Sequence, residues 1–174
     1  MAENRIAKFE KVSFEQYKKD YYDAFPECMD INNEEDLKVM YDMIELPKRA
    51  TKGSAGYDFY APFSFTMIPE ETIKIPTGIR CKMENGWVLK CYPRSGLGFK
   101  YQLNLANEVG IIDEDFYHSS NEGHIQIKLV NRGSETFSVK KGKGFSQGVF
   151  VPYGITVDDK CGGMRDGGFG STDK

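Results

Sequence analysis

Apolar residues along this chain follow two different spacings, which divide it into a short helical part and a longer part made of strands. In the helical part, aromatic side chains stand three or four positions apart, as on one helical face: Phe14, Tyr17, Tyr21 and Phe25. Asn32 or Asn33 can cap a second helix, which is expected to end at Pro47. The pattern therefore predicts a helical segment over residues 14–45.

The remainder of the chain is predicted to consist of short β-strands. Residues 5–13 alternate apolar and polar side chains, as a first strand would. From residue 50 onward, runs rich in β-branched and aromatic residues are separated by Pro, Gly and Asn. The expected strands cover residues 63–68, 71–75, 87–92, 125–130, 136–140 and 146–151. Strands this short are typical of a β-sandwich, barrel or jelly roll, so we expect one all-β domain over 1–174 with a helical insert.

Composition and charge exclude several classes of protein. The chain has 174 residues and a net charge of −3, and a weakly acidic chain is not expected to bind nucleic acid broadly. No apolar run reaches the ~18 residues of a membrane span, and the first residues lack the apolar stretch of a signal peptide. The four cysteines lie far apart and the chain has only two histidines. We therefore expect free thiols in a cytoplasmic protein, without a zinc site.

Two segments place polar side chains next to flexible backbone. Asp58 follows a glycine in AGYDFYA, where it can be an ordinary turn aspartate or a functional carboxylate. Arg94 and Ser95 stand before Gly96 in YPRSGLG, and together they offer a guanidinium, a hydroxyl and open backbone amides to an anion. The same segment could equally form a polar turn without a ligand.

Three further segments carry candidate chemistry. Asp113 follows an apolar Gly-Ile-Ile run, where a lone carboxylate is costly, so it is either held by structural hydrogen bonds or acts as a base. Gln147 lies within an expected strand, as a structural or a ligand-binding amide. The Gly-rich tail, residues 163–174, is predicted to be mobile and contains Arg165 and Phe169. Such a tail can wrap a phosphate chain while its ring stacks on a base, or it can be a frayed terminus.

Taken together, these segments resemble the five motifs of the trimeric dUTPase (deoxyuridine triphosphate nucleotidohydrolase) family in order and spacing. The resemblance extends from about residue 46 to the C-terminus and is carried by AGYD, PRSGLG, Asn-x-x-Gly-x-Ile-Asp-x-Asp-aromatic, the strand with Gln147, and GGFGST. It implies a jelly-roll-like fold and a homotrimer whose active sites each draw on all three subunits. One chain would supply Asp58, Arg94, Ser95 and Gln147, a second Asn107, Asp113 and Phe116, and the third the tail.

The resemblance also implies an activity, the hydrolysis of dUTP to dUMP and pyrophosphate, with dUMP then available for thymidylate synthesis. Asp113 would activate the water that attacks the α-phosphorus, and Mg²⁺ on the triphosphate would be held by Asp58 through bound water. Residues implied in substrate binding are Arg94, Ser95, Gly96, Asn107, Gly110, Ile112, Phe116, Gln147, Arg165, Phe169, Gly170, Ser171 and Thr172.

The chain departs from the family pattern at several positions. Phe116 stands where the family usually has a tyrosine under the deoxyribose, and the adjacent Tyr117 is a rival for that place. Residues 117–123 are longer than the usual turn, and Gly144 stands where the fourth motif normally has an arginine. Arg165 is one residue nearer to the tail aromatic than in the commonest form.

Two other functions compete with dUTP hydrolysis. A dCTP deaminase, or a bifunctional deaminase and dUTPase, would need a glutamate base near the pyrimidine, and Glu108 is the nearest candidate in the sequence. A regulatory protein partner could bind the helical segment 14–45, which has no counterpart in compact members of the family. Alternatively, the aromatic residues of that segment simply pack against the β-body.

Overall fold

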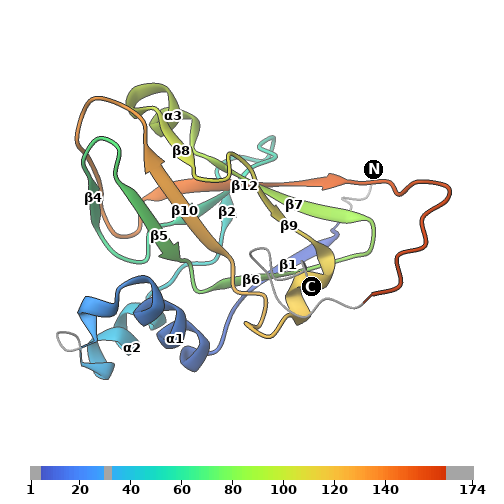
Figure 1. Cartoon of the computed structure of the whole chain (residues 1–174), viewed down its shortest axis with the longest axis horizontal. Helices are drawn as coiled ribbons and strands as arrows, with labels where there is room; N and C mark the ends of the chain where they lie inside the picture. Colours follow the sequence, from blue (N-terminus) through green and yellow to red (C-terminus); the bar gives the residue numbers. More distant parts are fainter. Residues whose placement is uncertain (1–4, 30–32, 164–174) are drawn as a thin grey trace.

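The chain folds into a body of antiparallel strands with two helices attached at one end (Figure 1). The computed structural model describes residues 5–29 and 33–163. The strands are β1 Ala7–Lys11, β2 Lys48–Arg49, β3 Tyr57–Tyr60, β4 Phe65–Met67, β5 Thr72–Pro76, β6 Ile79–Met83, β7 Trp87–Pro93, β8 Leu103–Leu105, β9 Gly110–Ile112, β10 Gln126–Asn131, β11 Phe137–Val139 and β12 Gly144–Pro152. The helices are α1 Phe14–Ala24, η1 Pro26–Cys28, α2 Glu34–Asp42, α3 Ser95–Tyr101 and η2 Glu114–His118.

Two larger sheets and two strand pairs make up the body. The five-stranded sheet has the order β2-β3-β12-β7-β9, and the three-stranded sheet has the order β5-β10-β8. Strands β1 and β6 form one pair and β11 and β4 the other. Every pairing in the described chain is antiparallel. The predicted all-β, jelly-roll-like fold is confirmed.

Alternation of apolar and polar residues decides which face of each strand turns inward. In β10, Ile127 and Leu129 are buried while Lys128 between them is exposed, because successive side chains of a strand point to opposite faces. The buried faces of the strands meet in one core. Its largest fully buried strand residues are Phe59, Met67, Ile75, Ile79, Leu89, Leu103, Leu105, Ile127 and Phe145.

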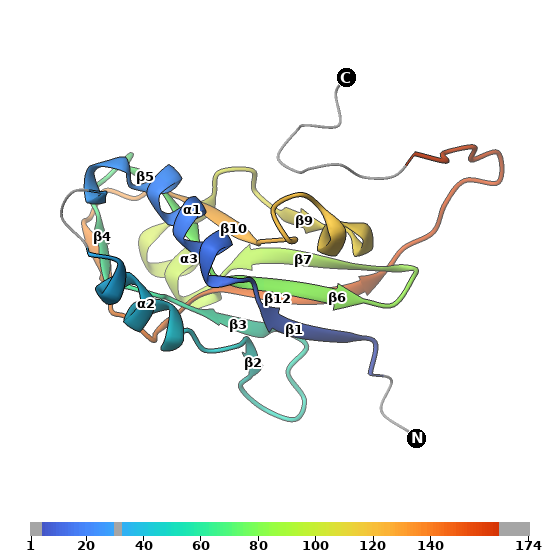
Figure 2. The same ribbon diagram turned by 90° about the horizontal axis from the view of Figure 1, so that it is seen from below.

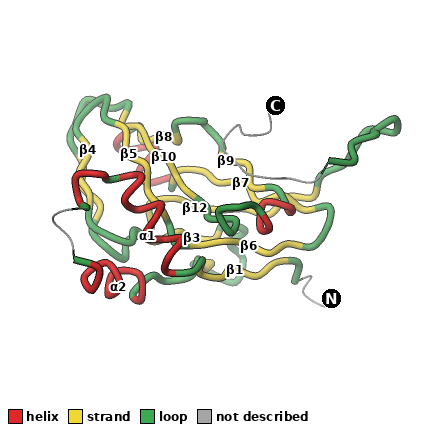
Figure 3. The backbone as a smooth tube through the Cα atoms, turned by 60° about the horizontal axis from the view of Figure 1, so that its bottom comes forward, coloured by secondary structure: helices red, strands yellow, loops and turns green. Residues whose placement is uncertain are grey.

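The helical insert is part of this core. Ser13 caps α1 by accepting a hydrogen bond from the backbone N–H of Gln16 at 3.1 Å. Tyr17 and Tyr21 of α1 are 0% and 6% exposed and belong to the core cluster, and α1 packs on β5, as Figures 2 and 3 show. The predicted packing of the aromatic residues of the insert against the β-body is confirmed.

The second helix is capped as expected but ends early. The side chain of Asn33 accepts from the N–H of Asp36 at 2.8 Å, so Asn33, not Asn32, is the cap. Helix α2 stops at Asp42, ahead of Pro47. The prediction that Pro47 ends the helix was wrong, because Met43 already closes the last turn by donating to Val39 O.

Several elements were not predicted from the pattern, among them β2, β3, β6, β8, α3 and η2. Within AGYDFYA, Tyr57–Tyr60 forms β3, Ile79–Met83 forms β6, and α3 begins at Ser95 in the segment 92–98, for which a polar turn was one alternative. β3 is only four residues long and follows a glycine, which gives a weak strand signal, and α3 begins with a run containing two glycines that disfavours a helix in isolation. Contacts with distant strands stabilise these segments instead.

Cys28, Cys81, Cys91 and Cys161 are all free thiols, as expected. Burial raises the pKa of the Cys91 thiol to about 12 and also raises that of Cys81, so both core thiols stay protonated at neutral pH. In the described part of the chain, no helix is long and apolar enough to cross a membrane.

Candidate functional site

Strands β3, β7 and β12 bring three of the predicted site residues together. Asp58 on β3 is paired with Gln147 on β12, and Gln147 is paired with Tyr92 on β7. Arg94 follows β7 directly and precedes α3. Its Nε lies 3.2 Å from Oδ1 of Asp58, and the two side chains are 44% and 16% exposed. A carboxylate and a partly exposed guanidinium therefore share one end of the central sheet.

Two glycines make room for the polar side chains of this cluster. A Cβ added at Gly144 would lie 2.9 Å from Nη1 of Arg94, and one added at Gly56 would lie 2.7 Å from Oε1 of Gln147. The Gly144 carbonyl also accepts a hydrogen bond from Arg94 Nη1 at 3.4 Å. Gly144 thus leaves space that the Arg94 side chain occupies. A larger residue at position 144, such as the arginine that the fourth motif normally has, would compete with Arg94 for this space.

Ser95 and Gly96 lie next to this cluster, at the start of α3. Both residues are exposed, and a Cβ added at Gly96 would meet no heavy atom within 4 Å. The hydroxyl of Ser95 and the backbone around Gly96 are therefore accessible to a ligand that contacts Arg94.

A second group of predicted residues surrounds a small cavity of about 250 Å³. Asn107, Gly110 and Ile112 line it together with residues of β10 such as Gln126. Asn107 lies in a tight turn in which the Val109 N–H donates to its carbonyl at 2.6 Å. The cavity combines a largely apolar lining with an amide side chain and turn backbone, a combination suited to a flat polar ring such as a pyrimidine.

The strands on either side of that turn do not pair with each other as a hairpin. β8 pairs with β10, whereas β9 pairs with β7. The segment that carries Asn107 is therefore a loop that crosses from one sheet to the other, not the hairpin that the family resemblance implies. This crossing opens the cavity between the turn and β10.

Asp113 and Phe116 lie just beyond β9. Asp113 precedes η2 and is partly exposed, and its carbonyl accepts from the Phe116 N–H at 3.2 Å. Phe116 is 5% exposed, so most of its ring is covered within this chain and only a small part is left to contact a ligand. The Tyr117 hydroxyl donates to Glu10 at 2.7 Å, and the Arg80 guanidinium lies 4.5 Å from the centre of its ring. Tyr117 is thus held by contacts with residues of β1 and β6.

Strand β7 connects the two groups. It pairs with β12 on one side and β9 on the other, and its Cys91, which lines the small cavity, is three positions before Arg94. The site residues predicted in the tail, Arg165, Phe169, Gly170, Ser171 and Thr172, lie outside the described residues.

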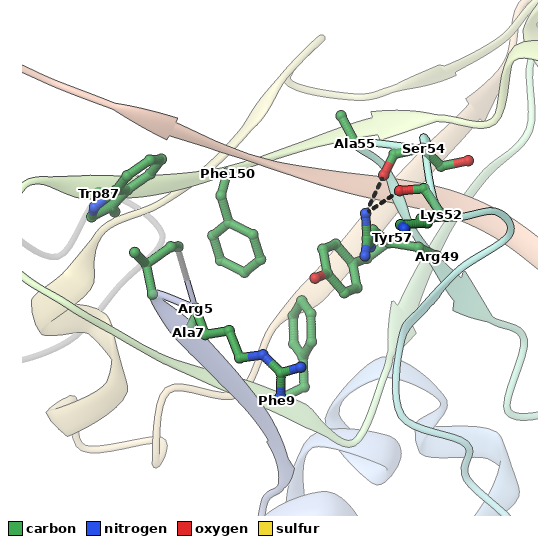
Figure 4. Close-up of a pocket in the computed structure, with 11 residues that line it drawn as sticks. Arg5, Ala7, Phe9, Arg49, Lys52, Ser54, Ala55, Tyr57, Trp87 and Phe150 are labelled. Carbon is green, nitrogen blue, oxygen red and sulfur yellow. Dashed lines mark hydrogen bonds between the residues drawn. The ribbon is translucent and has the colours of Figure 1, made fainter. Parts of the chain in front are cut away.

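A larger cavity, of about 650 Å³, lies elsewhere (Figure 4). Phe9, Tyr57 and Phe150 contact one another there with ring centres 5.4 to 5.7 Å apart. Arg49 lies at this cavity and donates to the carbonyls of Lys52 and Ser54. Among the described residues, none of the predicted site residues lines this cavity, so the candidate catalytic and binding residues lie elsewhere.

The donor set near Asp58 fits a metal ion carried mainly by a ligand. Among residues 5–29 and 33–163, no group of three or more His, Cys, Asp or Glu lies close enough together to hold a metal ion. Mg²⁺ commonly keeps several waters and binds through one or two carboxylates plus substrate phosphates. Asp58, 16% exposed beside Arg94, is suited to contact the waters of such an ion.

Comparison with known proteins gives a consistent result. A sequence model described as dUTPase matches residues 42–172. The deoxyuridine 5'-triphosphate nucleotidohydrolase of Lactococcus lactis is 42% identical over 132 residues, which cover 74% of this chain and 88% of that protein. The dUTPase crystal structure from Streptococcus mutans has a TM-score of 0.61 at 30% identity and covers 87% of this chain and 98% of that one.

A more distant structure shares the fold. It is a mutant dUTPase from phage phi11 of S. aureus, which is said to reveal the coordination of a structural Mg(II) ion. Its TM-score is 0.56 at 22% identity, and it covers 68% of this chain and 90% of that one. The family match spans the strands that carry both groups of site residues. The chain belongs to the dUTPase family of hydrolases.

Proposed function

We propose that this protein hydrolyses dUTP to dUMP and pyrophosphate. The observation that carries the proposal is the cavity of about 250 Å³ lined by Asn107, Gly110 and Ile112, with Asp113 next along the chain. It supports a pyrimidine site beside a carboxylate, in a chain whose relatives are named for this reaction.

In the proposed reaction, Asp113 accepts a proton from a water molecule and orients that water for attack on the α-phosphorus. Phosphoryl transfer requires positioning of the nucleophile and neutralisation of charge on the phosphate oxygens. Arg94 and Ser95 contact the phosphates, and Arg165 with the hydroxyls of Ser171 and Thr172 adds contacts from the tail. Asp113 also contacts the sugar, and Phe116 packs beneath it, which disfavours a 2′-hydroxyl.

Base selection follows from hydrogen-bond pairing at the turn of Asn107. Uracil offers an N3–H donor and an O4 acceptor, whereas cytosine reverses both. A site that pairs with uracil leaves buried polar groups unpaired with cytosine, a penalty that can reach about 10⁴–10⁵-fold in rate. The small cavity also leaves little room for the methyl group of thymine.

Mg²⁺ is the proposed cofactor, held mainly by the three phosphates. When bound, it withdraws charge from the phosphate oxygens and so favours attack at phosphorus. Asp58 would orient the waters of the ion, and the ion pair with Arg94 at 3.2 Å holds that carboxylate in place.

A homotrimer with shared sites is the proposed assembly. The segment after β12 leaves the body (Figures 1 and 2), and its Ile155 and Val157 are 75% and 108% exposed. Apolar side chains this exposed support a second chain as their partner. Such an arm would carry the tail toward the site of a neighbouring subunit.

The proposed place of action is the cytoplasm. Four free thiols support action in the reducing cytoplasm, where dUMP could supply thymidylate synthesis.

A regulatory protein could contact the outer side of the insert, where Met29, Val39 and Met43 are 61%, 55% and 60% exposed. No contact with a partner is needed for the insert to fold, since α1 already belongs to the core.

Pyrophosphate release from dUTP, dCTP, dTTP and UTP tests the function. We expect turnover of dUTP alone, dependent on Mg²⁺, and no ammonia from dCTP. Glu108, the candidate base of a deaminase, is exposed at a turn with φ of +62° and does not line the small cavity. Ammonia release from dCTP, or equal turnover of dUTP and UTP, would overturn the proposal.

A further inference from the structure

We infer that helix α1 of the insert positions the segment from Asp113 to Phe116, and that Asp20 and His124 are its principal positioning residues. The inference rests on the proposed function for the role of that segment. The insert lies outside the five motifs, yet it holds the end of the long connection between η2 and β10 in two places. Neither Asp20 nor His124 is proposed to touch the nucleotide.

The first contact joins the start of α1 to Glu122. The carboxylate of Glu122 accepts a hydrogen bond from the Ser13 N–H at 2.7 Å and another from the Ser13 hydroxyl at 2.6 Å. Burial opposes the negative charge of Glu122, but these hydrogen bonds outweigh it and lower its pKa. Ser13 is itself the cap of α1, so this one residue links the helix to the segment between η2 and β10.

The second contact is fully inside the protein. His124 is 0% exposed, and its Nδ1 lies 2.5 Å from Oδ2 of Asp20 on α1. The Gly78 N–H donates to Nε2 of His124 at 2.7 Å, so Nε2 carries no proton and Nδ1 is the donor to Asp20. Gln16 donates to the same Asp20 oxygen at 2.7 Å. The imidazole is thus fixed at both nitrogens, between the insert and the β-body.

Gly123, between these two anchors, lies directly against η2. A Cβ added at Gly123 would lie 2.7 Å from the Tyr117 Cα and 2.8 Å from the Phe116 carbonyl oxygen. The Ser119 hydroxyl oxygen lies 2.7 Å from the Phe116 carbonyl oxygen and 2.7 Å from Oδ1 of Asn121, so its single proton can bond to either acceptor. The Gly123 N–H also donates to the Asn121 side chain. Residues 119–124 therefore form a closed turn packed on the backbone of Phe116.

This chain of contacts gives the insert an effect at the site. Displacing residues 122–124 would displace the Phe116 backbone, and with it the Asp113 carbonyl that accepts from the Phe116 N–H. A shift of about 1 Å in a positioned group can cost about 10²-fold in rate. The insert and the lengthened segment 117–123 therefore together hold the backbone of Asp113 and Phe116 in position.

Three variants on one helix test the inference. Asp20→Ala removes the acceptor for His124, Asp20→Asn keeps a neutral acceptor of the same shape, and Asp23→Ala is the matched control. Asp23 lies on the same helix and its carboxylate pairs with Lys74 at 2.5 Å, with 67% of its side chain exposed. Each protein is assayed for kcat and KM with dUTP and UTP at a temperature where it is fully folded. Amide hydrogen exchange of residues 113–124 is measured without nucleotide.

Asp20→Ala is expected to lower kcat/KM for dUTP by about tenfold or more, to reduce the preference for dUTP over UTP, and to speed exchange over residues 113–119. Asp20→Asn should retain kcat/KM within about threefold of the parent, and Asp23→Ala within about twofold. A role in stability alone would lower Tm without changing kcat, KM or selectivity of the folded enzyme. If Asp20→Ala matches Asp23→Ala in catalysis, selectivity and exchange, the inference is overturned.

If Asp20→Ala does not fold, Glu122→Asn decides the question. Asn accepts the φ of +58° at this position but is too short to bind Ser13. The same changes in selectivity and exchange are expected, and unchanged values for both would overturn the inference. Failure of the proposed function looks different: the parent protein would not hydrolyse dUTP, while the exchange data would still show whether α1 fixes residues 113–119.

Discussion

Asp113 is the single residue on which the proposed chemistry depends most. Asp113→Asn keeps the shape of the side chain but removes its basicity, so the chemical step should slow by about 10²–10⁴-fold while dUTP still binds. Single-turnover kinetics and equilibrium binding of dUTP separate these effects. Asp115→Asn, two positions away on η2, is the matched control and should turn over nearly normally. Normal turnover of Asp113→Asn would move the base to Asp58 or Asp115.

Gly144 is a second residue with a testable role, because Arg94 occupies the space beside it. In Gly144→Ala, the new methyl group would lie 2.9 Å from Arg94 Nη1 and 3.0 Å from its Cδ, so the guanidinium must move. We expect KM for dUTP to rise about tenfold, with less than about 1 kcal/mol change in stability, since the displaced atoms belong to a flexible side chain. Gly154→Ala, where an added Cβ meets nothing within 4 Å, is the control. An unchanged KM in Gly144→Ala would show that the position of Arg94 does not matter for binding.

At the scale of elements, the pairing of β1 with β6 depends on a charged cluster around Glu10. Hydrogen bonds from Lys8 and from the Tyr117 hydroxyl, with the Arg80 charge, lower the pKa of Glu10 from 4.5 to about 2. Because the folded pKa is the lower one, Glu10 stabilises the fold above pH 4.5, and this contribution is lost as the pH falls through about 2. The cluster is partly exposed, so its contribution is discounted to about 1 kcal/mol.

Glu10→Gln should therefore be less stable than the parent by about 1 kcal/mol at pH 6, and the difference should shrink toward pH 3. Urea unfolding at the two pH values measures this. Glu15→Gln removes an exposed carboxylate on α1 that pairs with Lys18, and its effect should stay near zero at both. A difference for Glu10→Gln that grows on acidification contradicts the assignment.

At the scale of the whole molecule, the proposed trimer predicts complementation between two inactive proteins. One is Asp113→Asn, and the other is a truncation ending at Gly162, which lacks the tail. In a mixed trimer, some sites receive Asp113 from a truncated chain and the tail from an Asp113→Asn chain. Activity should return when the two proteins are unfolded and refolded together, but not when folded trimers are simply mixed.

The composition of the refolded trimers is checked by native mass spectrometry. Inactivity of mixed trimers of verified composition would show that base and tail come from the same subunit. Activity on simple mixing would instead indicate rapid exchange of subunits, which an added labelled chain can detect.

Local patterns determined much of this protein. The helical spacing of Tyr17 and Tyr21, a helix cap at Asn32 or Asn33, and a strand over residues 125–130 were all predicted, because periodicity, capping and strand-forming runs depend on residues a few positions apart. The order and spacing of the motifs likewise indicated the family. Whether the site residues act as expected stays a prediction, and those of the tail lie outside the described residues.

Only the tertiary structure decided which distant segments meet. Asp58 forms part of a strand because β12 and β2 pair with β3 on either side, and the loop after β8 crosses between sheets because β9 finds its partner in β7. The pairing of Asp20 with His124 joins residues 104 positions apart, and no local spacing signals it. Such contacts form because burying an ionisable group requires a partner to compensate for lost water, and that partner is chosen by the way the sheets pack.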